Sequence, residues 1–144
     1  MNASAAPRAQ RFRAADRVKK RGEFRQIQGH GRKVHTKHFL VMVHAPLTEH
    51  PRARLGITIT KKVGNAVARN RTRRVVREVF RRNPAIFPAG MDLVVIAKKG
   101  APELGFDDVL GEFRRAQSAL RRAAKQARGK SSADPARKGR SERQ

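Results

Sequence analysis

The sequence contains no cysteine, no tyrosine and no tryptophan. The absence of cysteine excludes disulfide bonds, thiolate catalysis and cysteine-ligated zinc, and it fits a reducing compartment. No run approaches the roughly 20 apolar residues that a membrane-spanning helix needs. No segment has the bulky apolar face of an interfacial helix either. We therefore expect a cytoplasmic protein that has no membrane partner.

The first residues, MNASAAPRAQRFR, also lack the apolar stretch of a secretory signal. An arginine-rich start that contains alanine and serine can resemble an organellar transit peptide. The segment is short, however, and Pro7 interrupts it. We interpret it instead as a mobile basic tail.

Acidic residues are scarce: the 144 residues include 11 Asp and Glu against 35 Lys and Arg, a formal net charge of +24. This excess is larger than solubility requires, and it favours binding to phosphate backbones through counterion release. The length allows one domain with tails. We predict a disordered basic tail over 1–15, a single RNA-binding α/β domain over 16–128, and a second disordered basic tail over 129–144.

The periodicity of apolar residues predicts six elements. They are a helix over 17–28, a strand over 33–45, a strand over 55–60, a helix from Asn65 to about Arg82, a strand over 91–98 and a helix over 105–128. We expect Asp16 to cap the first helix, and Gly29 and Gly31 to end it. The first two strands most simply pair antiparallel. This order fits a layered α/β sandwich.

The segment 61–83, KKVGNAVARNRTRRVVREVFRRN, contains nine Lys and Arg but only one acidic residue, Glu78. Its apolar residues still recur at helical spacing, as Ala68, Thr72, Val75, Val76, Val79 and Phe80. A helix face that is merely solvated usually mixes charges of both signs, whereas here arginines four residues apart repel each other. We interpret this helix as a surface that binds a polyanion, most simply RNA.

The turn before this helix brings Lys61 and Lys62 to the helix N-terminus, where unpaired N–H groups add affinity for anions. The turn does not match the GxxxxGK[ST] phosphate loop, so it does not support nucleotide hydrolysis. The five histidines show no metal-binding spacing, and the acidic residues are scattered. We therefore expect no catalytic residue and no metal site in the protein itself.

The segment LGITITKKVGNAVARNRTRRVVREVFRRN closely resembles the signature of the bacterial ribonuclease P protein component. Its core is the triplet Arg69-Asn70-Arg71, followed by Thr72-Arg73-Arg74 and Arg77-Glu78. The resemblance covers roughly residues 12 to 125. It implies a two-layer α/β sandwich with a mixed, mainly antiparallel sheet, in the order αβββαβα, with a left-handed β–α–β crossover around the basic helix.

The resemblance also implies a function. In this family a large catalytic RNA holds the metal ions and removes the 5′ leader of precursor tRNA, which gives the mature tRNA 5′ end. The protein would bind that RNA and hold the leader between the sheet and the first helix. It would bind no cofactor alone, although the RNA-containing holoenzyme requires Mg²⁺. Its partners would be the catalytic RNA and precursor tRNA, with no obligate protein partner.

Carried over by position, the RNA-binding set is Lys61, Lys62, Asn65, Arg69, Asn70, Arg71, Arg73, Arg74 and Arg77. The leader-binding set is Phe24, Phe39 and Met42. Gln28 and Met42 stand where many members of the family have an aromatic residue. Leader stacking is therefore expected to depend more on Phe24 and on charge.

Three alternatives stay open from the residues alone. The first is a binding module without a role in cleavage, such as a ribosomal protein or an RNA chaperone. The second is a nuclease that acts without an RNA subunit. The third is an architectural protein for double-stranded DNA, which the lack of a visible helix-turn-helix spacing or dimer motif disfavours.

Overall fold

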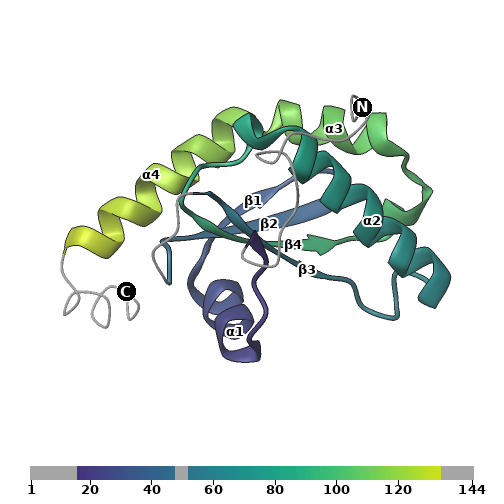
Figure 1. Ribbon diagram of the computed structural model, residues 1–144, viewed down its shortest axis with the longest axis horizontal. Coiled ribbons are helices and arrows are strands. Elements are labelled where there is room, and N and C mark those ends of the chain that lie inside the picture. Colours follow the sequence, from purple (N-terminus) through teal and green to yellow (C-terminus); the bar gives the residue numbers. More distant parts are fainter. Residues whose placement is uncertain (1–15, 48–51, 134–144) are drawn as a thin grey trace, which may run out of the picture.

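The computed structural model describes residues 16–47 and 52–133 (Figure 1). The elements are α1 (Arg21–His30), β1 (Arg32–His35), β2 (Phe39–His44), β3 (Arg54–Thr58), α2 (Ala66–Arg82), β4 (Asp92–Ala97), α3 (Phe106–Arg115) and α4 (Gln117–Ala133). Two short 3-10 turns, η4 (Pro84–Ile86) and η5 (Ala101–Glu103), flank β4. The two predicted disordered tails, apart from 129–133 in α4, lie outside the described residues. No helix among the described residues is long and apolar enough to cross a membrane.

The four strands form one mixed sheet in the order β1-β2-β4-β3. β1 pairs with β2 and β2 pairs with β4, both antiparallel, whereas β3 and β4 are parallel. The predicted strand over 33–45 is therefore two strands, because the chain turns at Thr36, whose N–H donates to the carbonyl of Phe39 at 2.7 Å. The predicted antiparallel pairing of the first two strands is also wrong. β4 lies between β2 and β3, since the chain crosses over through α2 before it returns to the sheet.

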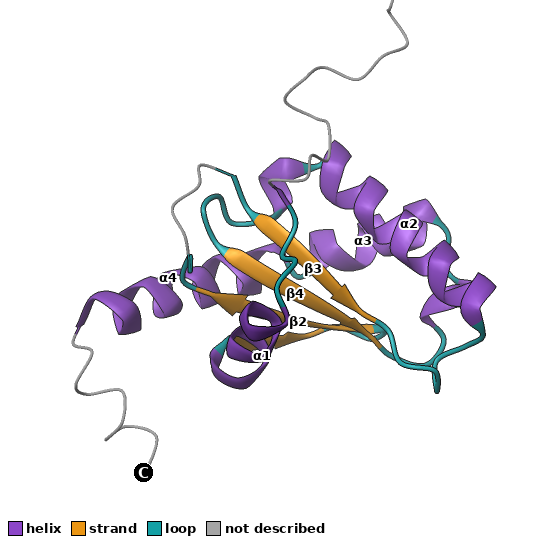
Figure 2. Ribbon diagram, turned by 60° about the horizontal axis from the view of Figure 1, so that its bottom comes forward, coloured by secondary structure: helices purple, strands orange, loops and turns teal. Residues whose placement is uncertain are grey.

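Helices cover both faces of this sheet (Figures 1 and 2). α2, α3 and α4 lie on one face, and their core includes Leu93 and Val95 of β4. α1 lies on the other face, where Ile27 packs with Met42 and Val94. From Leu93 to Ala97, β4 is apolar at every position, as expected for a strand that is covered on both faces. The mixed α/β fold is confirmed, and the left hand of the β3–α2–β4 crossover stays a prediction.

The first helix begins later than predicted. Residues 17–20 are extended instead, and Val18 donates its N–H to the carbonyl of Leu55 at 3.0 Å. Asp16 does not cap a helix, because its carboxylate pairs with Arg52 at 2.7 Å. The end of α1 agrees with the prediction at Gly31, which caps the helix with its N–H bonded to Ile27, whereas Gly29 lies inside the helix and does not end it.

The last predicted helix is two helices. Ala116, with φ −92° and ψ 0°, separates α3 from α4, and α4 continues to Ala133 rather than ending near 128. The predicted apolar stripe is nevertheless buried across the break, from Val109 and Phe113 to Leu120. The break lets α4 pack on β1 and β2 while α3 packs on α2.

Candidate nucleic-acid interface

α2 has the local signals of a well-defined helix. The Asn65 side chain accepts a hydrogen bond from the N–H of Ala68 at 2.9 Å, as an N-cap does. Four residues of the predicted stripe are buried against the core: Thr72, Val76, Val79 and Phe80. The helix ends where Pro84 begins η4. Seventeen residues make a rigid rod of roughly 25 Å, which fixes the positions of the arginines on its other sides.

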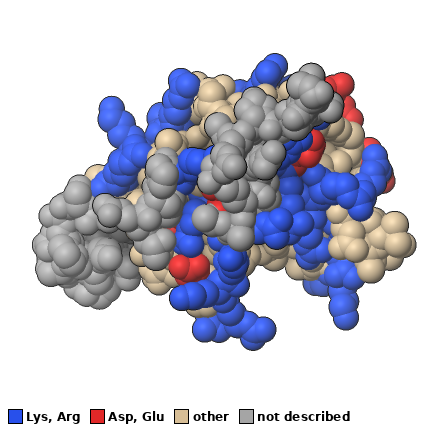
Figure 3. Space-filling view, in the orientation of Figure 1, with Lys and Arg blue, Asp and Glu red and all other residues tan. Residues whose placement is uncertain are grey.

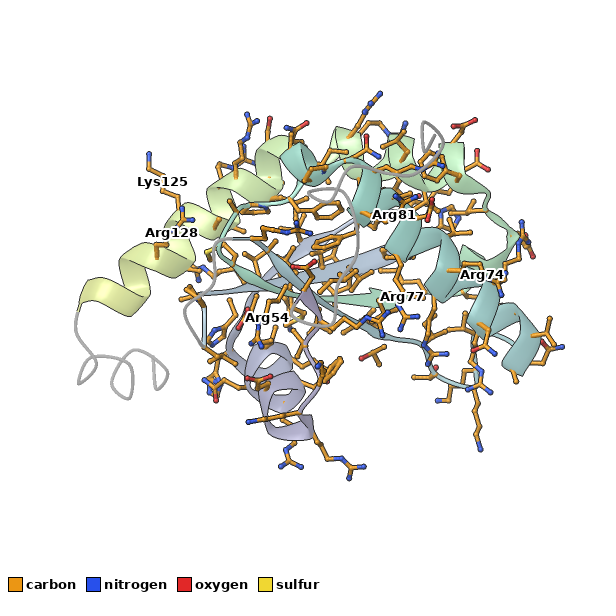
Figure 4. The ribbon with its side chains drawn as sticks, viewed as in Figure 1. Arg54, Arg74, Arg77, Arg81, Lys125 and Arg128 are labelled. Atoms are coloured by element: carbon orange, nitrogen blue, oxygen red, sulfur yellow. The ribbon has the colours of Figure 1, made fainter. Side chains whose placement is uncertain are left out.

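A hollow of about 430 Å³ runs along the solvent side of α2. Its lining consists of the guanidinium-bearing residues Arg17, Arg73, Arg74, Arg77 and Arg81, together with Asn70 and Glu78. Figure 3 shows the same predominance of Lys and Arg over this part of the surface, and Figure 4 shows Arg74, Arg77 and Arg81 projecting from α2. Five cations against one carboxylate make a strongly positive concave surface, which attracts anions.

Burial and the neighbouring arginines both act on the charge of Arg77. Burial lowers the pKa of its guanidinium, and the positive charges of Arg17 and Arg73 lower it further. Arg81 and Arg82, by contrast, both pair with Glu78, and Arg82 Nε lies 3.0 Å from the carboxylate. The hydrogen bond from Arg81 is the main cause of the lowered pKa of Glu78. The unbalanced charge of the hollow is therefore concentrated around Arg77.

The triplet Arg69-Asn70-Arg71 does not form one cluster. Arg69 Nε donates to the carbonyl of Asn65 at 3.4 Å, and Arg71 Nη1 donates to the carbonyl of Pro102 at 3.0 Å. Asn70 accepts a hydrogen bond from Arg73 Nη1 at 3.2 Å. Consecutive helical residues point about 100° apart. Only the middle residue of the triplet therefore lines the hollow, and the two arginines flank it.

Nine residues formed the predicted RNA-binding set, and the structure divides them. Asn70, Arg73, Arg74 and Arg77 line the hollow. Lys61 and Lys62 are exposed in the turn before α2, and Asn65 acts as the helix cap. These three residues lie at the N-terminal end of α2. They precede the residues of α2 that line the hollow, and they do not line it themselves.

The predicted leader-binding set is mostly buried. Phe39 has no exposed surface and packs against Phe113 with ring centroids 5.2 Å apart, and Met42 is only 1% exposed beneath α1. Neither side chain can stack on a base in this conformation, so these two assignments are wrong. Phe24 is half-buried on the α1 face, where its ring covers Gly56 so closely that an added Cβ would lie 2.6 Å away.

Two arginines of the hollow, Arg17 and Arg81, were not in the predicted binding set. Arg81 carried a signal, because it continues the four-residue spacing of Arg73 and Arg77. Arg17 carried no local signal. It reaches α2 only because the extended segment before α1 forms an isolated parallel bridge with Leu55 of β3.

No group of three or more His, Asp or Glu side chains that could hold a metal occurs within residues 16–47 and 52–133. His38 and Glu112 form a pair, with Nδ1 and Oε1 2.9 Å apart. Glu112 also accepts hydrogen bonds from Thr36 and from the N–H of His38, so this pair joins the turn between β1 and β2 to α3.

Comparison with known proteins agrees with this geometry. Residues 12–123 match the family model for ribonuclease P. The ribonuclease P protein component of Syntrophus aciditrophicus is 43% identical over 102 residues, which cover 71% of this chain and 84% of that protein. The protein component of Geobacter sp. strain M21 is 41% identical over 111 residues, which cover 77% and 93%.

Solved structures of ribonuclease P proteins also share the fold. The Staphylococcus aureus protein aligns with a TM-score of 0.64 at 30% identity, over 72% of this chain and 94% of that one. The Thermotoga maritima protein aligns with a TM-score of 0.60 at 33% identity, over 69% and 96%. With a four-stranded mixed sheet, an arginine-lined helix and these matches along most of its length, the chain belongs to the family of ribonuclease P protein components.

Proposed function

We propose that this chain, as the protein subunit of ribonuclease P, binds the catalytic RNA and the 5′ leader of precursor tRNA. It thereby assists the endonucleolytic removal of the leader that gives the mature tRNA 5′ end. The observation that carries this proposal is the hollow beside α2, where five guanidinium groups surround one carboxylate. Such a surface is destabilising until a polyanion neutralises it, and the forked guanidinium donors suit phosphate oxygens.

In this proposal the RNA breaks the bond, and the Mg²⁺ that the reaction needs belongs to the RNA. The protein contributes charge and shape. Asn70, Arg73, Arg74 and Arg77 contact phosphates of the catalytic RNA, and Arg17 extends this contact toward α1. Neutralised phosphates repel each other less, so the catalytic RNA and its substrate approach more closely at a lower Mg²⁺ concentration.

The leader lies on the α1 side of the sheet. Phe24 is the one member of the predicted stacking set that keeps exposed surface, so leader binding there depends on one partly exposed ring and on neighbouring basic residues such as Arg21 and Arg25 of α1. A stacked base contributes roughly 1–3 kcal/mol. We place this activity in the cytoplasm, with no membrane and no obligate protein partner.

Single-turnover cleavage of precursor tRNA tests the proposal. The cognate ribonuclease P RNA is assayed alone, the chain is assayed alone, and the two are assayed together, each at low and at high Mg²⁺. We expect the mixture to cleave far faster than the RNA alone at low Mg²⁺, and the chain alone to be inactive. Cleavage by the chain alone would indicate a protein-only nuclease. Binding without acceleration would indicate a module with no role in cleavage.

A further inference from the structure

A second basic hollow lies at the opposite edge of the sheet from β3. It measures about 430 Å³ and is formed by β1 and α4. Its polar lining consists of Arg32, Lys33 and His35 from β1, and Arg122 and Gln126 from α4. No carboxylate lines it. We name it the β1–α4 groove.

The groove results from how α4 packs on the edge strand. Val34 of β1 is buried in the same core as Ala123 and Ala127 of α4. The small alanine side chains let the helix approach the strand, while Arg32, Lys33 and Arg122 stay exposed beside the contact. On α4 the groove is lined by positions 119, 122, 123 and 126, which recur along one helix face.

A simpler explanation of charged residues on β1 is protection of an edge strand. Lysine on an edge strand prevents pairing with another chain. That explanation covers Lys33, but it does not explain why α4 adds Arg122 to the same concave surface. Within the described residues, Arg32, Lys33 and Arg122 form no ion pair. Three cations from two elements, none of them in an ion pair with a described residue, therefore converge on one groove.

We propose that the β1–α4 groove binds a second segment of the catalytic RNA backbone, separate from the segment that contacts α2. This inference rests on the proposed function. The phosphates would accept hydrogen bonds from Arg32, Lys33 and Arg122, and Gln126 could pair with a ribose hydroxyl. The forked guanidinium groups of Arg32 and Arg122 can each donate two parallel hydrogen bonds to a phosphate.

The position of the groove favours the catalytic RNA over the leader. α2 and α4 cover the same face of the sheet, at opposite ends of the view in Figure 4, where Lys125 and Arg128 of α4 lie far along the molecule from Arg74 and Arg77. α1, beside which the leader is proposed to lie, packs on the other face. A leader strand would have to turn around the sheet edge to reach the groove, whereas one large folded RNA can span the α2–α4 face.

The test compares two double variants that each remove two positive charges. The groove variant is Arg32→Ala with Arg122→Ala. The control is Arg114→Ala with Arg121→Ala, both exposed on α3 and α4, and neither lines the groove. Affinity for the cognate catalytic RNA, without precursor tRNA, is measured from about 100 to 500 mM KCl. Loss of two phosphate contacts should reduce the log–log salt slope of the groove variant by about 1.4–1.8, and the control slope should not change.

A third variant, Arg74→Ala with Arg77→Ala, separates this inference from the proposed function. If it loses affinity while the groove variant behaves like the control, the groove proposal is wrong and the proposed function stands. If the Arg74→Ala/Arg77→Ala variant also keeps full affinity for the RNA, the proposed function is wrong. Two further results would also overturn the groove proposal. In the first, the groove variant binds the catalytic RNA normally but no longer discriminates precursor tRNA from mature tRNA. In the second, the groove variant loses binding to polyglutamate but keeps binding to the RNA.

Discussion

Asp92 of β4 lies opposite Arg54 of β3 in the parallel register, and its carboxylate accepts hydrogen bonds from both Nε and Nη2 of Arg54 at 2.9 Å. Asp92 has no exposed surface, and its carboxylate also accepts the N–H of Leu47 at 2.9 Å. Arg54 reaches further, to Glu23 of α1 at 3.3 Å. This pair therefore joins the two parallel strands to the helix on the other face of the sheet.

The first prediction concerns this pair. Asp92→Ala leaves the Arg54 guanidinium without its main partner in a largely buried site. Breaking such a pair should lower the free energy of unfolding by about 3–5 kcal/mol. Urea denaturation with an unchanged m-value measures this, and the exposed control Glu103→Ala should stay within about 0.5 kcal/mol of the parent. A loss below 1 kcal/mol at Asp92 would show that the pair does not anchor the sheet.

The second prediction is a pH dependence at Glu112. Burial alone would raise the pKa of this carboxyl, but hydrogen bonds from Thr36 and His38 outweigh burial and hold the pKa below its ordinary value. The folded state therefore binds this proton less readily than the unfolded state. The resulting stabilisation is present above the unfolded pKa, at about 4.3, and is lost as the pH falls through the folded pKa.

Glu112→Gln should accordingly cost about 1–3 kcal/mol of unfolding free energy near pH 6. The difference between variant and parent should shrink as the pH falls toward 3, since the parent loses its charged hydrogen bonds there. Urea titrations at several pH values measure it, with Glu103→Gln as the exposed control. A difference that is constant across this range would contradict the assigned pKa direction.

The third prediction concerns anions. The repulsion among Arg17, Arg73 and Arg77 should be relieved by any multivalent anion that occupies the α2 hollow. Sulfate should therefore raise the melting temperature more than chloride at matched ionic strength, because it binds the folded state. Sulfate also stabilises proteins through surface exclusion. The sulfate-specific gain should therefore be compared with that of Arg74→Ala/Arg77→Ala, which should lose part of it. Equal gains in both proteins would exclude a site in the hollow.

The fourth prediction gives Arg77 opposite effects on stability and on binding. Arg77→Met removes a guanidinium that two like charges and burial disfavour, so the protein without RNA should become more stable at low ionic strength. The same change should weaken binding to the catalytic RNA and reduce the salt slope by about 0.7–0.9. The parent slope is expected between about −3.5 and −6, from five to eight phosphates at the single-strand coefficient.

Thermal melts and RNA binding over a KCl series measure both effects. Arg114→Met is the control, because Arg114 is exposed on α3 and forms no ion pair within the described residues. It should change neither quantity appreciably. A loss of stability together with normal RNA binding in Arg77→Met would mean that Arg77 serves the fold rather than the RNA.

Elements with strong local signals could be predicted from the sequence. α2 has its cap at Asn65, its buried stripe and its stop at Pro84, and all three signals lie within the element itself. β4 was predicted for a similar reason, because a run that is apolar at every position is stable only when both faces are covered.

Features that depend on distant partners could not be predicted. Asp16 is a good helix cap by residue type, but it pairs with Arg52 across the fold, and this leaves residues 17–20 free to extend along β3. Phe39 could equally have served the core or a nucleic-acid base. Its ring faces Phe113, which is 74 residues away in the sequence, and nothing local to Phe39 specifies that contact.

The sequence predicted that the arginines of α2 act as a set. It did not predict which of them pair within the protein and which remain available to a partner. Glu78 pairs with both Arg81 and Arg82, while Arg71 bonds to η5, so these guanidiniums are partly committed to the protein. Arg74 and Arg77 are not committed in this way, and they lie on the same side as Arg17. The spacing of charges predicts a cationic helix, and the fold decides which cations meet a partner.

The most direct test of this account is the rate of leader removal by the cognate ribonuclease P RNA at low Mg²⁺, with Arg74→Ala/Arg77→Ala compared against Arg114→Ala/Arg121→Ala. Both variants lose two positive charges, but only the first loses them from the α2 hollow. We predict that the hollow variant loses most of the acceleration and regains it when Mg²⁺ is raised, while the other keeps the parent rate. Equal rates for the two variants at every Mg²⁺ concentration would contradict the account.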